Sequence, residues 1–247
     1  MINIIILTIF PNIFDSIIKY GIINKAIKNN KLNIKLYNIR NFSKNKYKSI
    51  DDYQYGGGKG MVMKFEPIYY SLLNAKKDIG YNSYVIYLSP KGKIINNLDI
   101  IRLSNKKSII LLCGRYEGID NRIMNFINEE ISIGDYVLSG GEIPAMVLLD
   151  LISRNIYGVL NSYESIKNDS FFNNLLDYPS YTRPRKFMNI EVPNVLLSGN
   201  HKNIYKWRLI KSIEYTINNK PYLLYNRNFS NEENKIIKSF KLNLDKK

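Results

Sequence analysis

The stretch Ser132–Pro144 and the helix after it constrain the fold most strongly. The stretch, SIGDYVLSGGEIP, ends in a Gly-Gly pair, and Pro144 stands where a helix can begin, because its missing N–H is not needed in a first turn. Residues 145–152 are apolar on nearly every side, which predicts burial all round. We therefore expect a helix that lies in the core, in a subunit interface or in both.

Gly140 and Gly141 allow two interpretations. Glycine pairs mark ordinary tight turns. Glycine also lets the main chain approach a ligand closely, which suits a site that binds through peptide N–H and C=O groups. The neighbouring segments favour the second interpretation.

Strand-like and helix-like runs alternate along the first 160 residues, which predicts an α/β fold with a parallel sheet. Two of the expected strands stop at Ser89-Pro90 and at Cys113-Gly114, and Ser132–Pro144 supplies a third loop. Ligands of such sheets bind beyond the carboxyl ends of strands, so we expect one pocket. The expected strands are 3–9, 32–36, 84–88 and 108–112, and the expected helices run from Pro11 to Gly21, from Glu66 to Ala75 and over 95–103.

A polar loop, residues 38–64, interrupts this alternation. Structureless loops of this length are usually functional or disordered. It contains Gly56–Gly60, but no Ser or Thr follows Lys59, as a phosphate-binding P-loop would require. Nucleotide hydrolysis is therefore excluded.

The chain carries a formal net charge of +15, from 36 Lys and Arg against 21 Asp and Glu, which favours a polyanionic partner. Residues 178–247 hold 14 basic and 5 acidic residues, or +9, and the rest of the chain holds +6. Because the chain is also rich in Lys, Asn, Ile and Tyr, part of this charge reflects compositional bias. The basic part contains a helical pattern over 204–217 and a capping box, Ser230 with Glu233.

Several site types are excluded or disfavoured. One cysteine, Cys113, and one histidine cannot form a disulfide or a structural zinc site, so we expect no dedicated metal site. Cys113 ends a strand and is better explained as a buried thiol than as a nucleophile. No apolar run approaches the ~20 residues of a membrane span, and the first residues lack signal-peptide features. We expect a cytoplasmic protein with no membrane partner.

The chain resembles the bacterial tRNA (guanine-N1)-methyltransferases of the SPOUT class, the TrmD family. The resemblance covers nearly the whole chain and leaves only the last ~25 residues generic. It rests on motifs in one order: Leu7–Pro11, Asp51-Asp52 with Tyr55–Met61, Tyr87–Pro90, Gly114–Asp120, Ser132–Pro144, Asp169–Phe171, Tyr181–Pro184 and Leu196–Leu209.

The resemblance implies a knotted α/β catalytic domain over 1–160, a flexible linker over 161–173 and a small helical tRNA-binding domain over 174–247. The sheet is parallel and the knot a deep trefoil, a rare exception to unknotted topology. The family works as a homodimer whose active site is shared between subunits. We expect residues 161–169 to be disordered before RNA binds.

The resemblance also implies S-adenosyl-L-methionine as cofactor and methyl transfer to N1 of guanosine-37 in tRNA. The residues that match the family's cofactor pocket are Tyr87, Leu88, Ser89, Pro90, Gly114, Tyr116, Glu117, Gly118, Ile133, Gly134, Asp135, Tyr136, Val137, Leu138, Gly140, Gly141 and Pro144. The resemblance further implies that activity requires Mg²⁺, but no set of residues matches a dedicated Mg²⁺ site. Glu117 and nearby carboxylates are also explained as plain loop caps.

Two residues match the family's catalytic groups. Asp169 matches the base that removes the N1 proton, and Arg154 matches the cation beside O6. From the residues alone, Asp169 is better explained as a helix N-cap before Ser170, and Arg154 as a solvated helix end. Only the resemblance favours a catalytic role for either residue. Phosphate contacts are expected from Arg183, Arg185, Lys202, Lys206 and Arg208, whereas Ser180 departs from the family pattern.

Two alternatives compete with this interpretation. One is a non-catalytic RNA-binding protein that keeps the fold, for which the basic C-terminal part would suffice. The other is a SPOUT enzyme that acts on ribosomal RNA or on a ribose 2′-hydroxyl. A binder has no need of a cofactor cleft, and ribose chemistry does not require a carboxylate for a ring N–H, so both are disfavoured.

Overall fold

The computed structural model describes residues 1–160, 169–225 and 227–244, with side chains up to residue 240. The chain forms two compact units, Met1–Asn161 and Ser162–Lys247, and most residue neighbours belong to the same unit. The predicted disorder around 161–169 falls, except for Asp169, outside the described residues.

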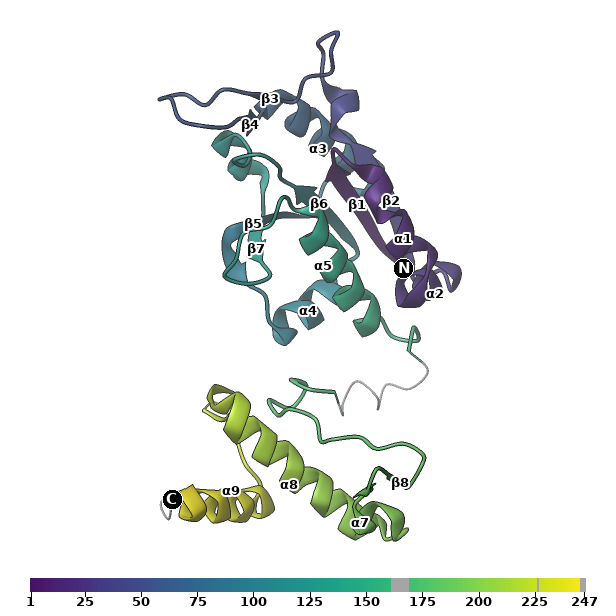
Figure 1. The fold of residues 1–247 in the computed structure, drawn as a ribbon. Coiled ribbons are helices and arrows are strands. Elements are labelled where there is room, and N and C mark those ends of the chain that lie inside the picture. Colours follow the sequence, from purple (N-terminus) through teal and green to yellow (C-terminus); the bar gives the residue numbers. More distant parts are fainter. Residues whose placement is uncertain (161–168, 226, 245–247) are drawn as a thin grey trace. The chain divides into compact units, whose positions relative to one another are not determined.

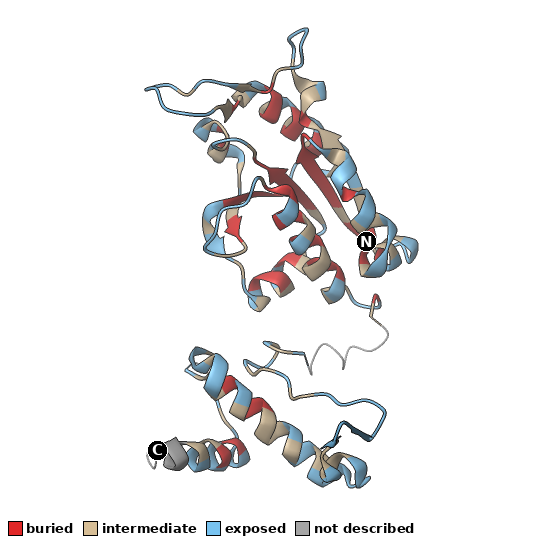
Figure 2. Ribbon diagram, in the orientation of Figure 1, coloured by how far each residue is buried: buried red, intermediate tan, exposed pale blue. Residues whose placement is uncertain are grey.

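A five-stranded sheet forms the centre of the first unit (Figure 1). Its order is β2-β1-β6-β5-β7, and every neighbouring pair is parallel. The central strands β1 and β6 are mostly apolar and buried, as expected for a sheet that is covered on both faces (Figure 2). The strands are β1 (Ile2–Thr8), β2 (Leu32–Asn38), β5 (Tyr84–Ile94), β6 (Ser108–Cys113) and β7 (Glu129–Ser132).

Alternate side chains of these strands supply two separate cores. On one face Ile4 of β1 and Leu111 of β6 pack with α1 (Asp15–Lys19), α2 (Gly21–Lys28), α4 (Asn97–Ser104) and α5 (Glu142–Asn155). On the other face Ile5 and Leu112 pack beneath α3 (Phe65–Ile79) and the 3-10 turns η2 (Ile39–Phe42) and η3 (Asn121–Phe126). The period-2 alternation along each strand therefore fixes which helices cover which face.

Strand β5 extends past Pro90, where the sequence predicts its end. Its pairing with β7 shifts register between Leu88 and Lys93, so the intervening residues leave the regular ladder and a proline without N–H is tolerated there. The same passage brings two backbones together. A Cβ at Gly92 would lie 2.5 Å from the Glu130 carbonyl carbon.

Other element boundaries also differ from the sequence prediction. Gly21 begins α2 instead of ending the helix before it, which is split into η1 (Pro11–Phe14) and α1. The helix after residue 95 begins only at Asn97, because Asn96 caps it. The loop 38–64 is partly structured, with η2 and a short antiparallel pair, β3 (Asp51–Asp52) and β4 (Val62–Met63).

Helix α5 begins two residues before Pro144, at Glu142, and it is not buried on every side. Ile143 is 46% exposed and Val147 is 38% exposed, one turn apart. Most of the other apolar residues of the helix pack into the core, as predicted. These two side chains leave an apolar strip on the surface of the first unit.

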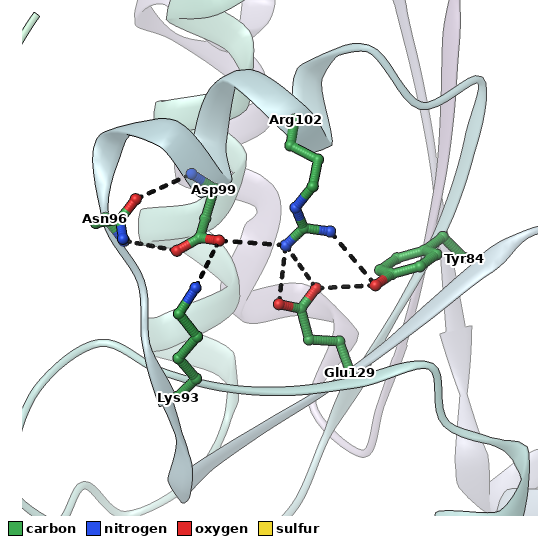
Figure 3. Close-up of polar contacts among 6 residues, drawn as sticks. All are labelled: Tyr84, Lys93, Asn96, Asp99, Arg102 and Glu129. Atoms are coloured by element: carbon green, nitrogen blue, oxygen red, sulfur yellow. Dashed lines mark hydrogen bonds and ion pairs between the residues drawn. The ribbon is translucent and has the colours of Figure 1, made fainter.

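A polar network ties α4 to β5 and to the start of β7 (Figure 3). Arg102 donates to both carboxylate oxygens of Glu129 at 2.8 Å, and Tyr84 Oη donates to the same carboxylate. Asp99 accepts from Lys93 Nζ at 3.0 Å and forms a reciprocal capping box with Asn96. These polar contacts therefore join α4 to β5 and β7, in addition to the apolar contacts of Ile100 and Leu103 in the core.

The described part of the second unit is built from helices and one small hairpin. Strands β8 (Lys186–Phe187) and β9 (Ile190–Glu191) pair antiparallel. The helices are α7 (Asn194–Leu197), α8 (His201–Asn219) and α9 (Asn231–Leu244), with the 3-10 turn η4 (Pro221–Leu224) between the last two. The predicted capping box is confirmed, since Ser230 Oγ accepts from Glu233 N while Glu233 Oε2 accepts from Ser230 N.

Candidate functional site

The irregular passage of β5 around Ser89 and Pro90 and the loops after β6 and β7 line a cavity of about 280 Å³ in the first unit. The structure brings together on its wall every residue of the pocket predicted from the sequence except Asp135, which is exposed. The loops converge because the three strands are parallel neighbours in the sheet and end at the same edge.

Several residues of the same wall were not predicted from the sequence. Lys91, Arg115, Asn121 and Glu130 line the cavity as well. Arg115 belongs to the Gly114–Asp120 motif, which offered a signal, although nothing in the motif says which way its side chain turns. Glu130 lies within β7, and only the register of that strand places it at the cavity.

Tyr87 forms the buried floor of the cavity. Burial raises the pKa of its phenol to about 12, with a further contribution from the charge of Glu130, against hydrogen bonds with Ser89 and the Ile119 backbone. The phenol is therefore neutral at physiological pH. Gly114 is required beside it, because a Cβ there would lie 2.9 Å from Tyr87 Oη.

The end of the polar loop 38–64, from Gly60 to Met63, lies against the rim of this cavity. Glu117 N donates to Met61 O at 3.0 Å, and Met63 N donates to Gly118 O at 2.9 Å. Gly60 has φ +86°, and a Cβ there would lie 2.6 Å from Glu117 Cγ. This loop, which the sequence alone does not connect with the pocket, is thus hydrogen-bonded to one of the pocket's walls.

A second wall is fixed by an ion pair between Arg115 and Glu142. Arg115 Nε lies 2.8 Å from Glu142 Oε2, and the Glu142 side chain is fully buried. Gly141 N also donates to Gly114 O at 2.9 Å. The loop after β6 and the loop after β7 are therefore joined directly to each other beside the cavity.

The two predicted catalytic residues belong to different units. Arg154 lies exposed in the last turn of α5. Asp169 is exposed in the second unit and lines a cavity of about 480 Å³ with Asp177, His201 and Arg208. Residues 170–174 form turns instead of a helix, so the alternative of Asp169 as a helix N-cap is wrong.

The predicted RNA contacts fall into two groups within the second unit. Arg183, Arg185 and Arg208 line a cavity of about 420 Å³, and the Arg208 guanidinium lies 4.7 Å from the centre of the Tyr178 ring. Lys202 and Lys206 lie exposed one turn apart on α8. Both groups leave cations available to a polyanion.

The described residues contain no cluster of three or more His, Cys, Asp or Glu side chains that could hold a metal ion. Within the same residues, no helix combines the length and apolar character that a membrane span needs.

The first unit is thus an α/β domain with a cavity at one edge of a parallel sheet, and the described part of the second unit is mainly helical and carries exposed Arg and Lys side chains. The chain belongs to the tRNA (guanine-1)-methyltransferase family TrmD, whose family model matches residues 2–226. Family membership favours the enzyme over the non-catalytic binder.

Relatives of similar length carry names that agree with this family. A tRNA (guanine-N(1)-)-methyltransferase of Buchnera aphidicola subsp. Schizaphis graminum is 51% identical over 96% of this chain and 90% of its own. One of Clostridioides difficile is 53% identical over 85% of this chain and 92% of its own. The crystal structure of tRNA (m1G37) methyltransferase from Aquifex aeolicus is similar with a TM-score of 0.75 and 39% identity, covering 89% of this chain and 93% of that one.

Proposed function

We propose that this protein transfers a methyl group from S-adenosyl-L-methionine to N1 of guanosine-37 in tRNA. The observation that supports this most is the cavity at the ends of β5, β6 and β7, which gathers the residues expected to bind the cofactor. Its wall combines apolar side chains such as Leu88 and Ile133 with backbone groups and a neutral phenol. This donor set fits a purine, a ribose and an amino-acid tail.

The cofactor supplies, when bound, a methyl group on a positively charged sulfur. N1 of guanine carries a proton and is a poor nucleophile, so a base must take that proton while the N–C bond forms. We assign this role to the Asp169 carboxylate. Arg154 stabilises the negative charge that builds on the neighbouring O6, because a guanidinium donates two hydrogen bonds and carries a permanent charge.

The apolar strip on α5 supports the homodimer that the resemblance implies. The 3-10 turn η1 contacts α5, and Phe10 just before this turn and Ile13 within it are each at least 40% exposed. Apolar side chains grouped on a surface mark a protein interface. We propose that a second copy covers them and that the active site is completed between subunits.

The remaining implications belong to the same proposal. The first unit contains the trefoil knot, the second binds the anticodon stem through its cations, and a tRNA substrate agrees with a cytoplasmic location. Mg²⁺ takes part in the reaction with few protein ligands, as hard cations often do.

The test is transfer of labelled methyl to unmodified tRNA with G at position 37, beside an A37 control, followed by identification of the product nucleoside. We expect 1-methylguanosine on the G37 substrate alone. Asp169→Asn should lower the rate at least ~100-fold, in the range of general-base catalysis, while cofactor binding is retained. Asp177→Asn is the matched control, since Asp177 shares the same cavity without an assigned role.

Two results would contradict the proposal. One is tight tRNA binding with no transfer, with and without Mg²⁺, which would favour the RNA-binding protein. The other is an Asp169→Asn variant as active as Asp177→Asn, which would remove Asp169 from the chemistry.

A further inference from the structure

Thr8 and Glu142 form a polar link with Arg115, which itself lines the cavity. Thr8 Oγ1 donates to Glu142 Oε1 at 2.8 Å, and Arg115 Nε donates to Glu142 Oε2 at 2.8 Å. Glu142 and Thr8 are fully buried. Three segments far apart in the sequence, the end of β1, the loop after β6 and the start of α5, therefore meet at one carboxylate.

The Glu142 carboxylate is fixed in place by these contacts. A buried charge is costly unless it is paired and hydrogen-bonded, and here each carboxylate oxygen has its own donor. Glu142 is also the first residue of α5, where the helix dipole favours a negative charge. Removing either donor would leave a buried acceptor poorly satisfied, so the carboxylate holds Arg115 firmly.

Arg115 connects two walls of the cavity. Its backbone belongs to the loop after β6, whereas its Nη1 donates to Ser139 O at 3.0 Å in the loop after β7. The guanidinium also lies 4.8 Å from the centre of the Phe10 ring. A planar fork can hold Glu142 and Ser139 at once, which a lysine ammonium on a flexible stem cannot do in the same geometry.

Gly140 packs closely against the same Arg115 side chain. A Cβ at this position would lie 2.3 Å from Arg115 Nε, although the Gly140 backbone is not in the left-handed region. The absence of a side chain here thus makes room for the guanidinium. The sequence interpretation of Gly140, close approach to a ligand, is incomplete without this packing requirement.

We propose that Arg115 is a positioning residue, which Glu142 and Thr8 hold so that it sets the spacing of the loops after β6 and β7 and thereby the affinity for S-adenosyl-L-methionine. The inference rests on the proposed function, because it takes that cofactor as the ligand of the cavity. It assigns to the three side chains a role that acts through the loops.

The experiment measures the dissociation constant of S-adenosyl-L-methionine by calorimetric titration, together with thermal unfolding of each protein. Arg115→Lys, Glu142→Gln and Gly140→Ala should each weaken binding about tenfold, or about 1.4 kcal/mol. The double variant Arg115→Lys/Glu142→Gln should be no weaker than the poorer single variant by more than about twofold, because both changes break one link.

Arg102→Lys is the matched control. It alters another Arg–Glu pair with 2.8 Å contacts, and neither Arg102 nor Glu129 lines the cavity (Figure 3). We expect it to lower the melting temperature while leaving the dissociation constant unchanged. A control that weakens binding as much as Arg115→Lys would show a general loss of stability and overturn the inference.

The remaining outcomes separate the two proposals. If the unaltered protein binds the cofactor and Arg115→Lys binds it equally well, the positioning role is wrong and the proposed function stands. Additive losses in the double variant would likewise overturn the link. If the unaltered protein does not bind S-adenosyl-L-methionine, the proposed function itself fails.

Discussion

Cys113 ends β6 with its side chain fully buried in the core that α5 covers. Burial raises the pKa of this thiol well above its ordinary value, and the charge of Glu142 adds to the effect. Because the thiolate is the reactive form, a thiol in this position is inert.

We therefore expect native protein to leave Ellman's reagent unreacted at about pH 8, and unfolded protein to release one equivalent per chain. Unfolding in guanidinium before the reagent is added provides the control. Rapid release of a full equivalent from native protein would mean that the carboxyl end of β6 opens to solvent. A buried thiol was also the sequence prediction, and the structure confirms it.

At the scale of elements, the charge of Asp99 stabilises the start of α4. Burial alone would raise the pKa of Asp99, but the hydrogen bond from Lys93, the Asn96 backbone N–H and the hydrogen bond from Arg102 outweigh it and hold this pKa below the ordinary value of 3.8. A carboxyl whose pKa is lower in the folded state stabilises the fold above its unfolded pKa. That contribution is lost as the pH falls through the lower, folded value.

Asp99→Asn should accordingly lower the free energy of unfolding by about 1–3 kcal/mol at about pH 7, the range of hydrogen bonds to charged groups. The difference between the variant and the unaltered protein should shrink as the pH falls below 3.8. Urea unfolding between about pH 3 and pH 7 measures it. A difference that stays constant across this range would show that the charge of Asp99 contributes nothing.

The strands and the long helices could be predicted from the sequence because apolar residues repeat with the period of each element. Several of their ends could not, although the capping box at Ser230 did predict the start of α9. The bond of Asn96 to Asp99 starts α4, and the register shift after Leu88 lets β5 continue through Pro90. Both depend on partners that only the folded chain supplies.

For the cavity too, part could be predicted from the sequence and part could not. Its three loops follow from the order of strands and turns, so most of its wall could be named in advance. The link from Arg115 to Glu142 spans 27 positions and depends on how two loops pack. One sequence carries no record of that pairing. Asp135 failed for a related reason, since its loop turns that side chain outward.

For the whole molecule, the proposed function leads us to expect that the concentration of charge in residues 178–247 governs contact with tRNA. Each phosphate that a cation neutralises releases counterions, so affinity falls steeply with salt. Lys202 and Lys206 are exposed one turn apart on α8. They present two such cations to one backbone.

Changing both to glutamine should weaken tRNA binding and reduce the slope of log affinity against log salt by about 1 to 2. Filter binding between about 50 and 300 mM KCl measures the slope. The same change at Lys76 and Lys77, at the end of α3, keeps the net charge equal and serves as control. An equal effect at both pairs would mean that net charge alone attracts the RNA.

The close backbone passages at Gly92 and Gly141 have a consequence for how this chain can evolve. A Cβ at Gly141 would lie 2.8 Å from Cys113 Cα, and one at Gly92 would meet the backbone of Glu130. The obstacle in both places is main chain, which no substitution elsewhere removes. Compositional bias toward Lys, Asn, Ile and Tyr can therefore change exposed positions, but it cannot replace glycine at these two positions without moving the backbone. Glycine would be required at both positions even in a descendant that had lost the activity, because the requirement comes from the fold.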